Sequence, residues 1–271
     1  MNLRAATPTA ADPFGTHLRH WRVHRRLSQL DLAQEAEVST RHLSYVETGR
    51  AAPSREMVLR LADRLEVPLR ERNALLVAAG YAPMYRQRAL DDPALAAARR
   101  AVDLVLKGHE PFPALAVDRH WNLVAHNAVV PLLMAGASAE LLQPPINVLR
   151  LSLHPEGLAP RIANLAQWRA HLLERLQQQI AATGDATLAA LHDELAAYRT
   201  DHAGHDASGV GGDLSGVVVP FQLATEGGVL SFISTTTVFG SPVDITLQEL
   251  AVESFFPSDA QTTALLAALG G

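Results

Sequence analysis

The sequence predicts an all-α domain of five helices followed by an α+β domain, in which helices accompany a small antiparallel sheet. The 271 residues exceed the size of one small domain. Residues 13–82 contain short helical patterns, whereas residues 105–271 mix short β-type runs with longer helical segments. The charge also changes sign, because residues 1–88 hold 14 Arg, no Lys and 9 acidic residues, giving +5, and the remainder carries −10. A basic part ahead of an acidic one indicates that the first part faces a polyanion.

Composition narrows the possible classes of protein. Apolar residues make up 48% of the chain and charged residues 19%, which is typical of folded domains. The absence of Cys excludes disulfides, thiolate catalysis and Cys-based zinc sites, and it fits a reducing cytosol. No apolar run reaches the roughly 18 residues that span a bilayer, and residues 1–13 contain no apolar signal core. We therefore expect a cytoplasmic protein that is not inserted in a membrane.

Local capping signals divide the first domain, residues 13–82, into five helices. Phe14, Leu18 and Trp21 recur at helical spacing and predict the first helix. Ser28 and Ser39 each precede a helical pattern, where an N-cap is expected, and a glycine C-cap follows the third pattern. The expected helices cover residues 13–26, 29–36, 40–48, 55–65 and 68–80.

A linker is expected at residues 83–104, because residues 82–95 contain two Pro and mixed charge. The helical pattern at residues 94–107 belongs either to this linker or to the start of the second domain, which we place at residues 105–271.

Strand-like and helical segments alternate along the second domain. Two apolar runs, residues 114–117 and 123–125, predict a hairpin. Helical segments follow at residues 127–135, 147–153, 160–182 and 186–199, and the polar, Gly-rich residues 200–216 predict a loop. Further strands are expected at residues 217–224, 229–239 and 250–256, and a last helix at residues 260–269.

Residues 27–53 carry the pattern that bears most directly on function. Two short helices meet at a tight turn around Glu37, and the second presents small and polar side chains at its N-terminal end. A helix placed in this way can enter the major groove, about 12 Å wide, with its first turn against the base edges. The segment therefore predicts a helix-turn-helix that reads double-stranded DNA.

Residues 14–80 resemble the Cro/C1 (XRE-type) family of helix-turn-helix regulators. The family often has Gly where Glu37 stands, and a positive φ at a residue other than Gly costs on the order of 1 kcal/mol. The positions that carry the resemblance are Leu18, Arg19, Arg22, Leu27, Ser28, Gln29, Leu32, Ala33, Val38, Ser39, Leu43, Ser44, Glu47, Gly49, Pro53, Ser54, Leu61 and Ala62.

The resemblance to Cro/C1 regulators implies roles for individual residues. Gln29 would bind a phosphate, and Arg22 and Glu47 would form an ion pair inside the domain. Arg41 would suit a guanine base, whereas Tyr45 could also be partly buried against the second helix. The recognition helix would begin at Ser39, Thr40 and Arg41; Thr40, Arg41, Ser44 and Tyr45 would face the groove, and His42 and Arg50 would meet the DNA backbone. Proteins of this class bind paired half-sites as dimers, so a homodimer is expected.

Residues 105–269 are similar to the ligand-binding domain of MmyB-like regulators, which has a PAS-like fold. The similarity rests on the block at residues 113–130, the block at residues 147–150, Trp168, residues 191–195 and the strands within residues 217–239. It implies a pocket for a fatty acid or another small apolar ligand. The candidate lining residues are Phe221, Leu223, Leu230 and Phe232, and the candidates for contact with a carboxylate head are Arg119, His126 and Asn127. Core packing, hairpin capping and surface exposure are the alternative roles of these residues.

We therefore expect a sequence-specific transcriptional regulator, with repression as the default, whose second domain binds an apolar ligand and pairs subunits. One alternative is a second domain that serves only as a protein-interaction scaffold. Another is a metal-dependent enzyme, for which His192, His202, His205 and Asp206 are the available ligands. Their spacing matches no recognised motif, so we assign no catalytic residue, metal or cofactor.

Overall fold

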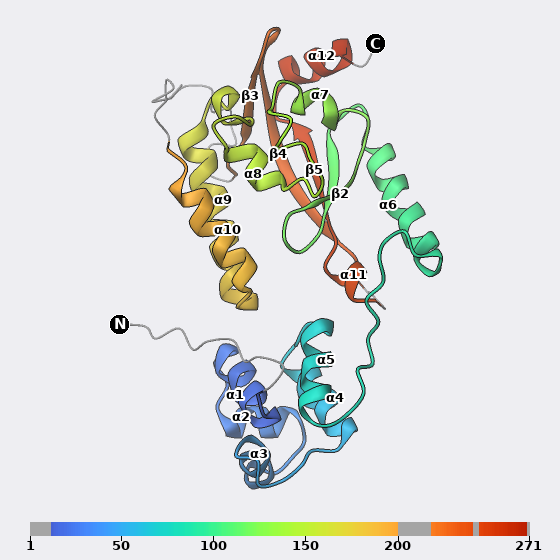
Figure 1. Cartoon of the computed structure of the whole chain (residues 1–271), viewed down its shortest axis with the longest axis vertical. Coiled ribbons are helices and arrows are strands. Elements are labelled where there is room, and N and C mark those ends of the chain that lie inside the picture. The colour runs from blue at the N-terminus through green and yellow to red at the C-terminus, as the bar shows by residue number, and fades with distance from the viewer. Residues whose placement is uncertain (1–11, 200–217, 241–243, 270–271) are drawn as a thin grey trace. The chain divides into compact units, whose positions relative to one another are not determined.

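A computed structural model describes residues 12–199, 218–240 and 244–269, which form two compact units (Figure 1). The first unit contains the described residues up to Ala89 together with residues 244–248, and the second contains the rest. Within the described ranges, no helix combines the length and the apolar character needed to cross a membrane. The expected loop at residues 200–216 lies outside the described residues, as do His202, His205 and Asp206.

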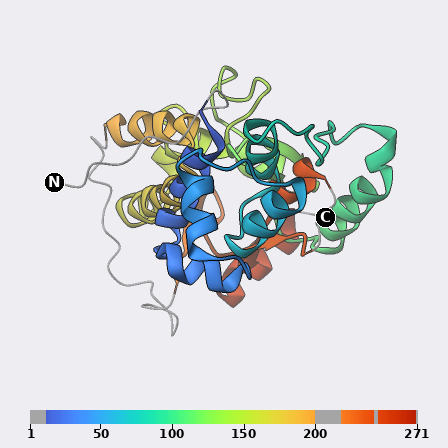
Figure 2. The same cartoon turned by 90° about the horizontal axis from the view of Figure 1, so that it is seen from below.

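Five helices build the N-terminal part of the first unit, as expected, and Figure 2 shows them from a second direction. They are α1 (Phe14–His24), α2 (Gln29–Glu35), α3 (Thr40–Glu47), α4 (Arg55–Arg64) and α5 (Leu69–Ala78). Each ends one or two residues before the expected position, where the last helical residues give way to a C-cap. The core that they enclose includes Leu18, Leu32, Leu43, Leu61 and Leu65, each at most 1% exposed.

Two backbone features bring α3 close to the other helices. Glu37 adopts φ 55° in the turn between α2 and α3, the left-handed conformation expected there. Gly15 on α1 lies against the C-terminal end of α3, and a Cβ atom at this position would stand 2.2 Å from the carbonyl oxygen of Glu47. Helices α1 and α3 can pack this closely only because residue 15 has no side chain.

A short helix from the C-terminal half of the chain packs against α5. This helix, α11 (Ile245–Gln248), follows Asp244, whose carboxylate is fully buried and accepts a hydrogen bond from Nη1 of Arg88 at 3.1 Å. The side-chain oxygen of Gln248 accepts a hydrogen bond from the backbone N–H of Leu69 at 2.7 Å. This bond satisfies a donor in the first turn of α5, where the N-cap Pro68 provides no side-chain acceptor. Sequence analysis placed these residues in the second domain and assigned them no helix.

The second unit contains a five-stranded antiparallel sheet with strand order β2-β1-β5-β4-β3. Its strands are β1 (Ala114–Val117), β2 (Leu123–His126), β3 (Phe221–Thr225), β4 (Gly228–Val238) and β5 (Ala251–Pro257). The register pairs Phe221 with Phe232 and Thr236 with Glu253. The α+β expectation is confirmed, although β3 begins at Phe221 and residues 218–220 form no strand.

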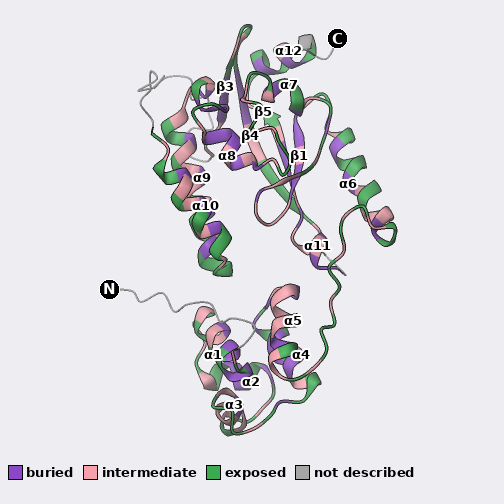
Figure 3. Ribbon diagram, viewed as in Figure 1, coloured by how far each residue is buried: buried purple, intermediate pink, exposed green. Residues whose placement is uncertain are grey.

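Helices cover both faces of the sheet and contribute to two apolar clusters. The helices of this unit are η1 (Pro93–Leu95), α6 (Ala96–Gly108), α7 (Val130–Met134), α8 (Val148–Leu153), η2 (Ala159–Arg161), α9 (Leu165–Thr183), α10 (Ala186–Ala197) and α12 (Ala260–Leu269). The larger cluster joins α8, α9 and α10 to β3 and β4, with Leu176, Leu223 and Phe232 fully buried. The smaller one joins Val102 and Leu106 of α6 to β1 and β5. Figure 3 shows buried and exposed residues alternating along α6, as expected for a helix with one face on a sheet.

Candidate nucleic-acid interface and ligand cavity

Two serine caps set the start of α2 and of α3. Ser28 and Asp31 form a capping box, because Ser28 Oγ accepts from the N–H of Asp31 while the Asp31 carboxylate accepts from the N–H of Ser28. Ser39 Oγ accepts from the N–H of His42 at 3.2 Å. Ser39 therefore starts α3 through its side chain, and its predicted contact with DNA is a separate expectation.

A network of hydrogen bonds joins α1 and the first residue of α2 to the last residue of α3. Glu47, at the end of α3, has 3% of its side chain exposed and binds Nε of Arg22 at 2.6 Å and Nη2 at 3.0 Å. It also accepts a hydrogen bond from the amide of Gln29 at 2.7 Å. The expected pair of Arg22 and Glu47 is confirmed, and Gln29 belongs to the same network. Because bidentate Arg–carboxylate pairs are directional, the network fixes how α3 lies relative to α1 and α2.

The outer side of α3 offers polar groups at helical spacing. Leu43 and Val46 point into the core, whereas Arg41 is exposed and Tyr45 is half-buried. Arg41 Nε donates a hydrogen bond to Tyr45 Oη at 3.0 Å, and the guanidinium carbon lies 5.4 Å from the Tyr45 ring centroid. Tyr45 is thus partly buried, as one of its two expected roles requires, and it also orients Arg41; its contact with DNA stays a prediction.

The remaining candidates for DNA contact lie on α3 and directly before or after it. Thr40, His42 and Ser44 are half-buried on α3, and Ser39 and Arg50 are exposed before and after it. Gly49, with φ 72°, ends the helix and turns the chain toward Arg50. Within the first unit, the N-terminal turn of α3 is therefore accessible and carries the groups that a major-groove helix needs.

The second unit contains an apolar cavity between its sheet and helices α7, α8 and α9. The space open to the centre of a water-sized sphere is about 100 Å³. The cavity is lined by Pro113, Leu115, Trp121, Leu123, Val130, Leu133, Met134, Val148, Leu149, Leu151, Ser152, Leu158, Trp168, Leu172, Arg175, Phe221, Ser234, Glu253 and Phe255. A concave, mostly apolar site with few polar groups is typical of pockets for small molecules.

Among the described residues of this lining, the charged ones are Arg175 of α9 and Glu253 of β5. Arg175 binds the Glu253 carboxylate through Nη1 at 3.2 Å and through Nη2 at 2.6 Å. Thr236 Oγ1 accepts from Arg175 at 2.6 Å and donates to Glu253 at 2.8 Å. The guanidinium carbon of Arg175 also lies 4.5 Å from the centroid of the Trp121 ring. One end of the cavity is therefore polar and closely hydrogen-bonded.

A second, polar recess shares Trp121 and Arg175 with the apolar cavity. It is lined by Val117, Asp118, Arg119, Trp121, Arg175, Gln179, Glu249 and Ala251. The space in it that is open to the centre of a water-sized sphere is about 210 Å³. Arg119 Nη1 lies 3.5 Å from the carboxylate of Asp185 and 3.8 Å from that of Glu249. Burial acts to raise the pKa of Asp185, but the hydrogen bond from His120 and the charge of Arg119 lower it below its usual value.

The predicted ligand residues have different surroundings. Phe221 lines the apolar cavity, but Leu223, Leu230 and Phe232 are fully buried core residues outside its lining.

The three candidates for a carboxylate contact lie away from the apolar cavity. Asn127 is buried and bonded to the backbone, because it accepts from Ala114 N–H and donates to the carbonyl oxygens of Leu106 and Phe112. His126 is exposed and bonds the Asn127 carbonyl. Arg119 lines the polar recess, where it is paired with carboxylates.

The sequence contains a signal for the polar end of the cavity in two of its segments. Glu253 interrupts the apolar strand Ala251–Pro257, and an acidic residue among apolar neighbours in a strand is a candidate functional residue. Trp168, Leu172 and Arg175 recur at spacings of four and three, which places Arg175 on the same apolar face of α9.

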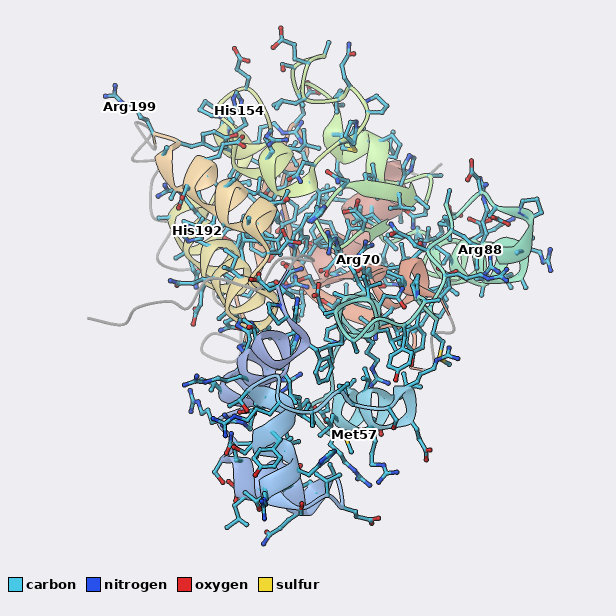
Figure 4. All side chains as sticks on the ribbon, turned by 60° about the horizontal axis from the view of Figure 1, so that its bottom comes forward. Met57, Arg70, Arg88, His154, His192 and Arg199 are labelled. Carbon is cyan, nitrogen blue, oxygen red and sulfur yellow. The ribbon has the colours of Figure 1, made fainter. Side chains whose placement is uncertain are left out.

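The described residues contain no group of three or more His, Cys, Asp or Glu that could hold a metal ion. His192 lies on α10, as Figure 4 shows, and its Nδ1 is 3.5 Å from Asp193. The other residues of the metal-dependent alternative are outside the described ranges.

Comparisons with models of known protein families give two matches. Residues 13–75 match a helix-turn-helix domain. Residues 98–269, more than half of the chain, match the ligand-binding domain of MmyB-like transcription regulators. No curated protein matches the chain.

Proposed function

The chain belongs to the MmyB-like transcription regulators, and we propose that it is a dimeric repressor. Its affinity for the operator changes when an amphiphile with a long apolar chain, such as a fatty acid or a derivative, fills the apolar cavity. The family makes it a ligand-responsive DNA-binding regulator. We propose in addition the residues that contact the operator, the repression, the dimer and the chemical class of the ligand.

The observation that carries the DNA-binding part is the accessible first turn of α3, held by the network of Arg22, Gln29 and Glu47. Arg41 lies in this turn and is steadied by Tyr45, so its guanidinium can present two donors to O6 and N7 of a guanine. Two such helices, one from each subunit, would bind half-sites about one helical turn apart.

The test is a selection of DNA from random oligonucleotides, followed by affinity measurements with Arg41→Ala. We expect this variant to lose about 1–3 kcal/mol on the selected operator and much less on random DNA. Arg99→Ala, which removes an exposed Arg from α6 of the ligand-binding domain, is the matched control and should bind like the wild type. Equal losses for Arg41→Ala on operator and random DNA would refute base reading by Arg41.

Ligand binding is supported by the lining of the cavity. Each CH₂ group transferred from water into such a site contributes about 0.8 kcal/mol, so an alkyl chain gains affinity with its length until the cavity is full. Met134 on α7 lines the cavity, whereas Leu132 on the same helix is 50% exposed and does not line it.

Substitutions at these two positions test the site. Met134→Trp should fill the cavity and abolish the thermal stabilisation produced by decanol, and Leu132→Trp should retain it. If Met134→Trp responds to decanol as the wild type does, the ligand does not bind in this cavity.

The connection between β4 and β5 supports a route between cavity and DNA-binding domain. Ser234 and Glu253 line the cavity on these strands, and residues 244–248 between them pack on α5 in the first unit. Only residues 249 and 250 separate α11 from β5, so a shift of β5 can reach the first unit along the chain. Gln248→Ala removes the bond to Leu69 N–H and should reduce the effect of decanol on operator affinity while decanol still binds. An unchanged effect would exclude this bond from the coupling.

A further inference from the structure

We propose that the cavity selects an amphiphile whose head group is uncharged and can form hydrogen bonds, such as an alcohol or an ester, over one with a free carboxylate. This inference rests on the proposed function and narrows its ligand class from fatty acids and their derivatives to the uncharged derivatives. It follows from the ion pair of Arg175 and Glu253 at the polar end of the cavity.

The head group of a bound amphiphile belongs at this polar end. The charged residues of the lining are there, and Arg175 also binds Thr236, which is exposed. Elsewhere the lining is almost entirely apolar, and the hydroxyl of Ser152 already accepts a hydrogen bond from Trp168 Nε1. An alkyl chain therefore suits the inner part of the cavity, and a polar head suits the end next to Arg175.

The positive charge at this end is already neutralised. Glu253 has 5% of its side chain exposed and takes two donors from Arg175 and one from Thr236. A carboxylate placed next to Arg175 would share that one cation with the buried carboxylate of Glu253 at close range, and the two like charges would repel each other. An uncharged hydroxyl or ester oxygen can accept from the guanidinium without disturbing the pair.

The polar recess beyond Trp121 does not provide an alternative anion site. Gln179 holds the indole N–H of Trp121 at 2.8 Å and Arg175 stacks on its ring, so Trp121 separates the two spaces. The lining of this recess contains two arginines, and both are paired with carboxylates: Arg119 with Asp185 and Glu249, and Arg175 with Glu253. A carboxylate that passed Trp121 would therefore find both cations already neutralised.

Calorimetric titration with decanol, methyl decanoate and decanoate, below their aggregation concentrations, tests the proposal on the wild-type protein. The three probes share one chain and differ in the head. We expect decanol and methyl decanoate to bind more tightly than decanoate by about tenfold or more. Decanoate binding as tightly as decanol would overturn the proposal and leave the apolar ligand site standing. Failure of all three to bind would refute the ligand site itself.

Glu253→Gln tests the cause of the selectivity. It removes the negative charge and frees Arg175 to bind an anion, so decanoate should gain affinity by about tenfold and should raise the unfolding temperature of this variant more than that of the wild type. Glu194→Gln is the matched control, because Glu194 forms a similar bidentate pair with Arg150, at 2.6 and 2.7 Å, outside the cavity lining. It should keep the wild-type preference. A decanol-to-decanoate ratio that Glu253→Gln leaves unchanged would overturn the role of Glu253.

Discussion

Replacing Gly15 with Ala tests how closely α1 must approach the recognition helix. An added Cβ would lie 2.2 Å from the carbonyl oxygen of Glu47 and 2.9 Å from that of Val46. Both are backbone atoms inside α3, so neither can rotate away, and α1 must move outward. Overpacking of this kind lowers the free energy of unfolding by about 1–3 kcal/mol. The better helix propensity of Ala raises it by about 1 kcal/mol. Because the contact is so short, we place the cost near the upper end of that range, at about 3 kcal/mol, which leaves a net loss of about 2 kcal/mol.

Scanning calorimetry of the full chain measures this loss. For a domain of this size, 1 kcal/mol shifts the unfolding temperature by about 4–8 °C, so the transition of the first unit should fall by on the order of 10 °C. Gly108→Ala is the control, because its Cβ would meet nothing within 4 Å at the end of α6, and it should leave stability unchanged or slightly raised. A Gly15→Ala transition at or above the wild-type temperature would refute the close approach of α1 and α3.

Three further predictions concern polar contacts. Glu47→Ala leaves the charge of Arg22, whose side chain is 11% exposed, without a carboxylate partner, so the variant should lose about 3 kcal/mol or more in chemical unfolding, and wild-type stability would contradict the network. Asn127→Ala leaves the N–H of Ala114 and the carbonyls of Leu106 and Phe112 without this partner, and should lose on the order of 3 kcal/mol; a loss near zero would mean that these groups find other partners. The hydrogen bond from Arg150 lowers the pKa of Glu194 below its ordinary 4.5, so the pair stabilises the domain above that pH and the gain disappears as the pH falls through the lowered pKa. The stability difference between wild type and Glu194→Gln should therefore shrink on acidification below pH 4.5, and a difference that does not depend on pH would contradict it.

The sequence allowed the first unit to be predicted closely because its signals are local. Ser28 and Ser39 cap the helices that follow them, and each apolar stripe lies within one helix. The ion pair of Arg22 and Glu47 was predicted from the resemblance to Cro/C1 regulators. By contrast, the bond between Gln248 and Leu69 joins residues 179 positions apart, and no local pattern indicates it.

The ligand residues were harder to predict for a physical reason. Alternation along a strand identifies the apolar face of a sheet, and Phe221, Leu223, Leu230 and Phe232 are indeed buried on it. It does not show where the covering helices leave a space, so Phe221 lines the cavity and the other three are core residues. Asn127 follows a strand, a position that suits a ligand contact as well as the backbone bonds that it makes.

The regulatory account is tested most directly by the affinity of the wild-type protein for its selected operator, measured with and without saturating decanol and repeated with Met134→Trp. The account predicts an enriched operator of two half-sites about one helical turn apart, with an affinity that decanol changes for the wild type and leaves unchanged for Met134→Trp. An operator affinity that is the same with and without bound decanol would contradict it.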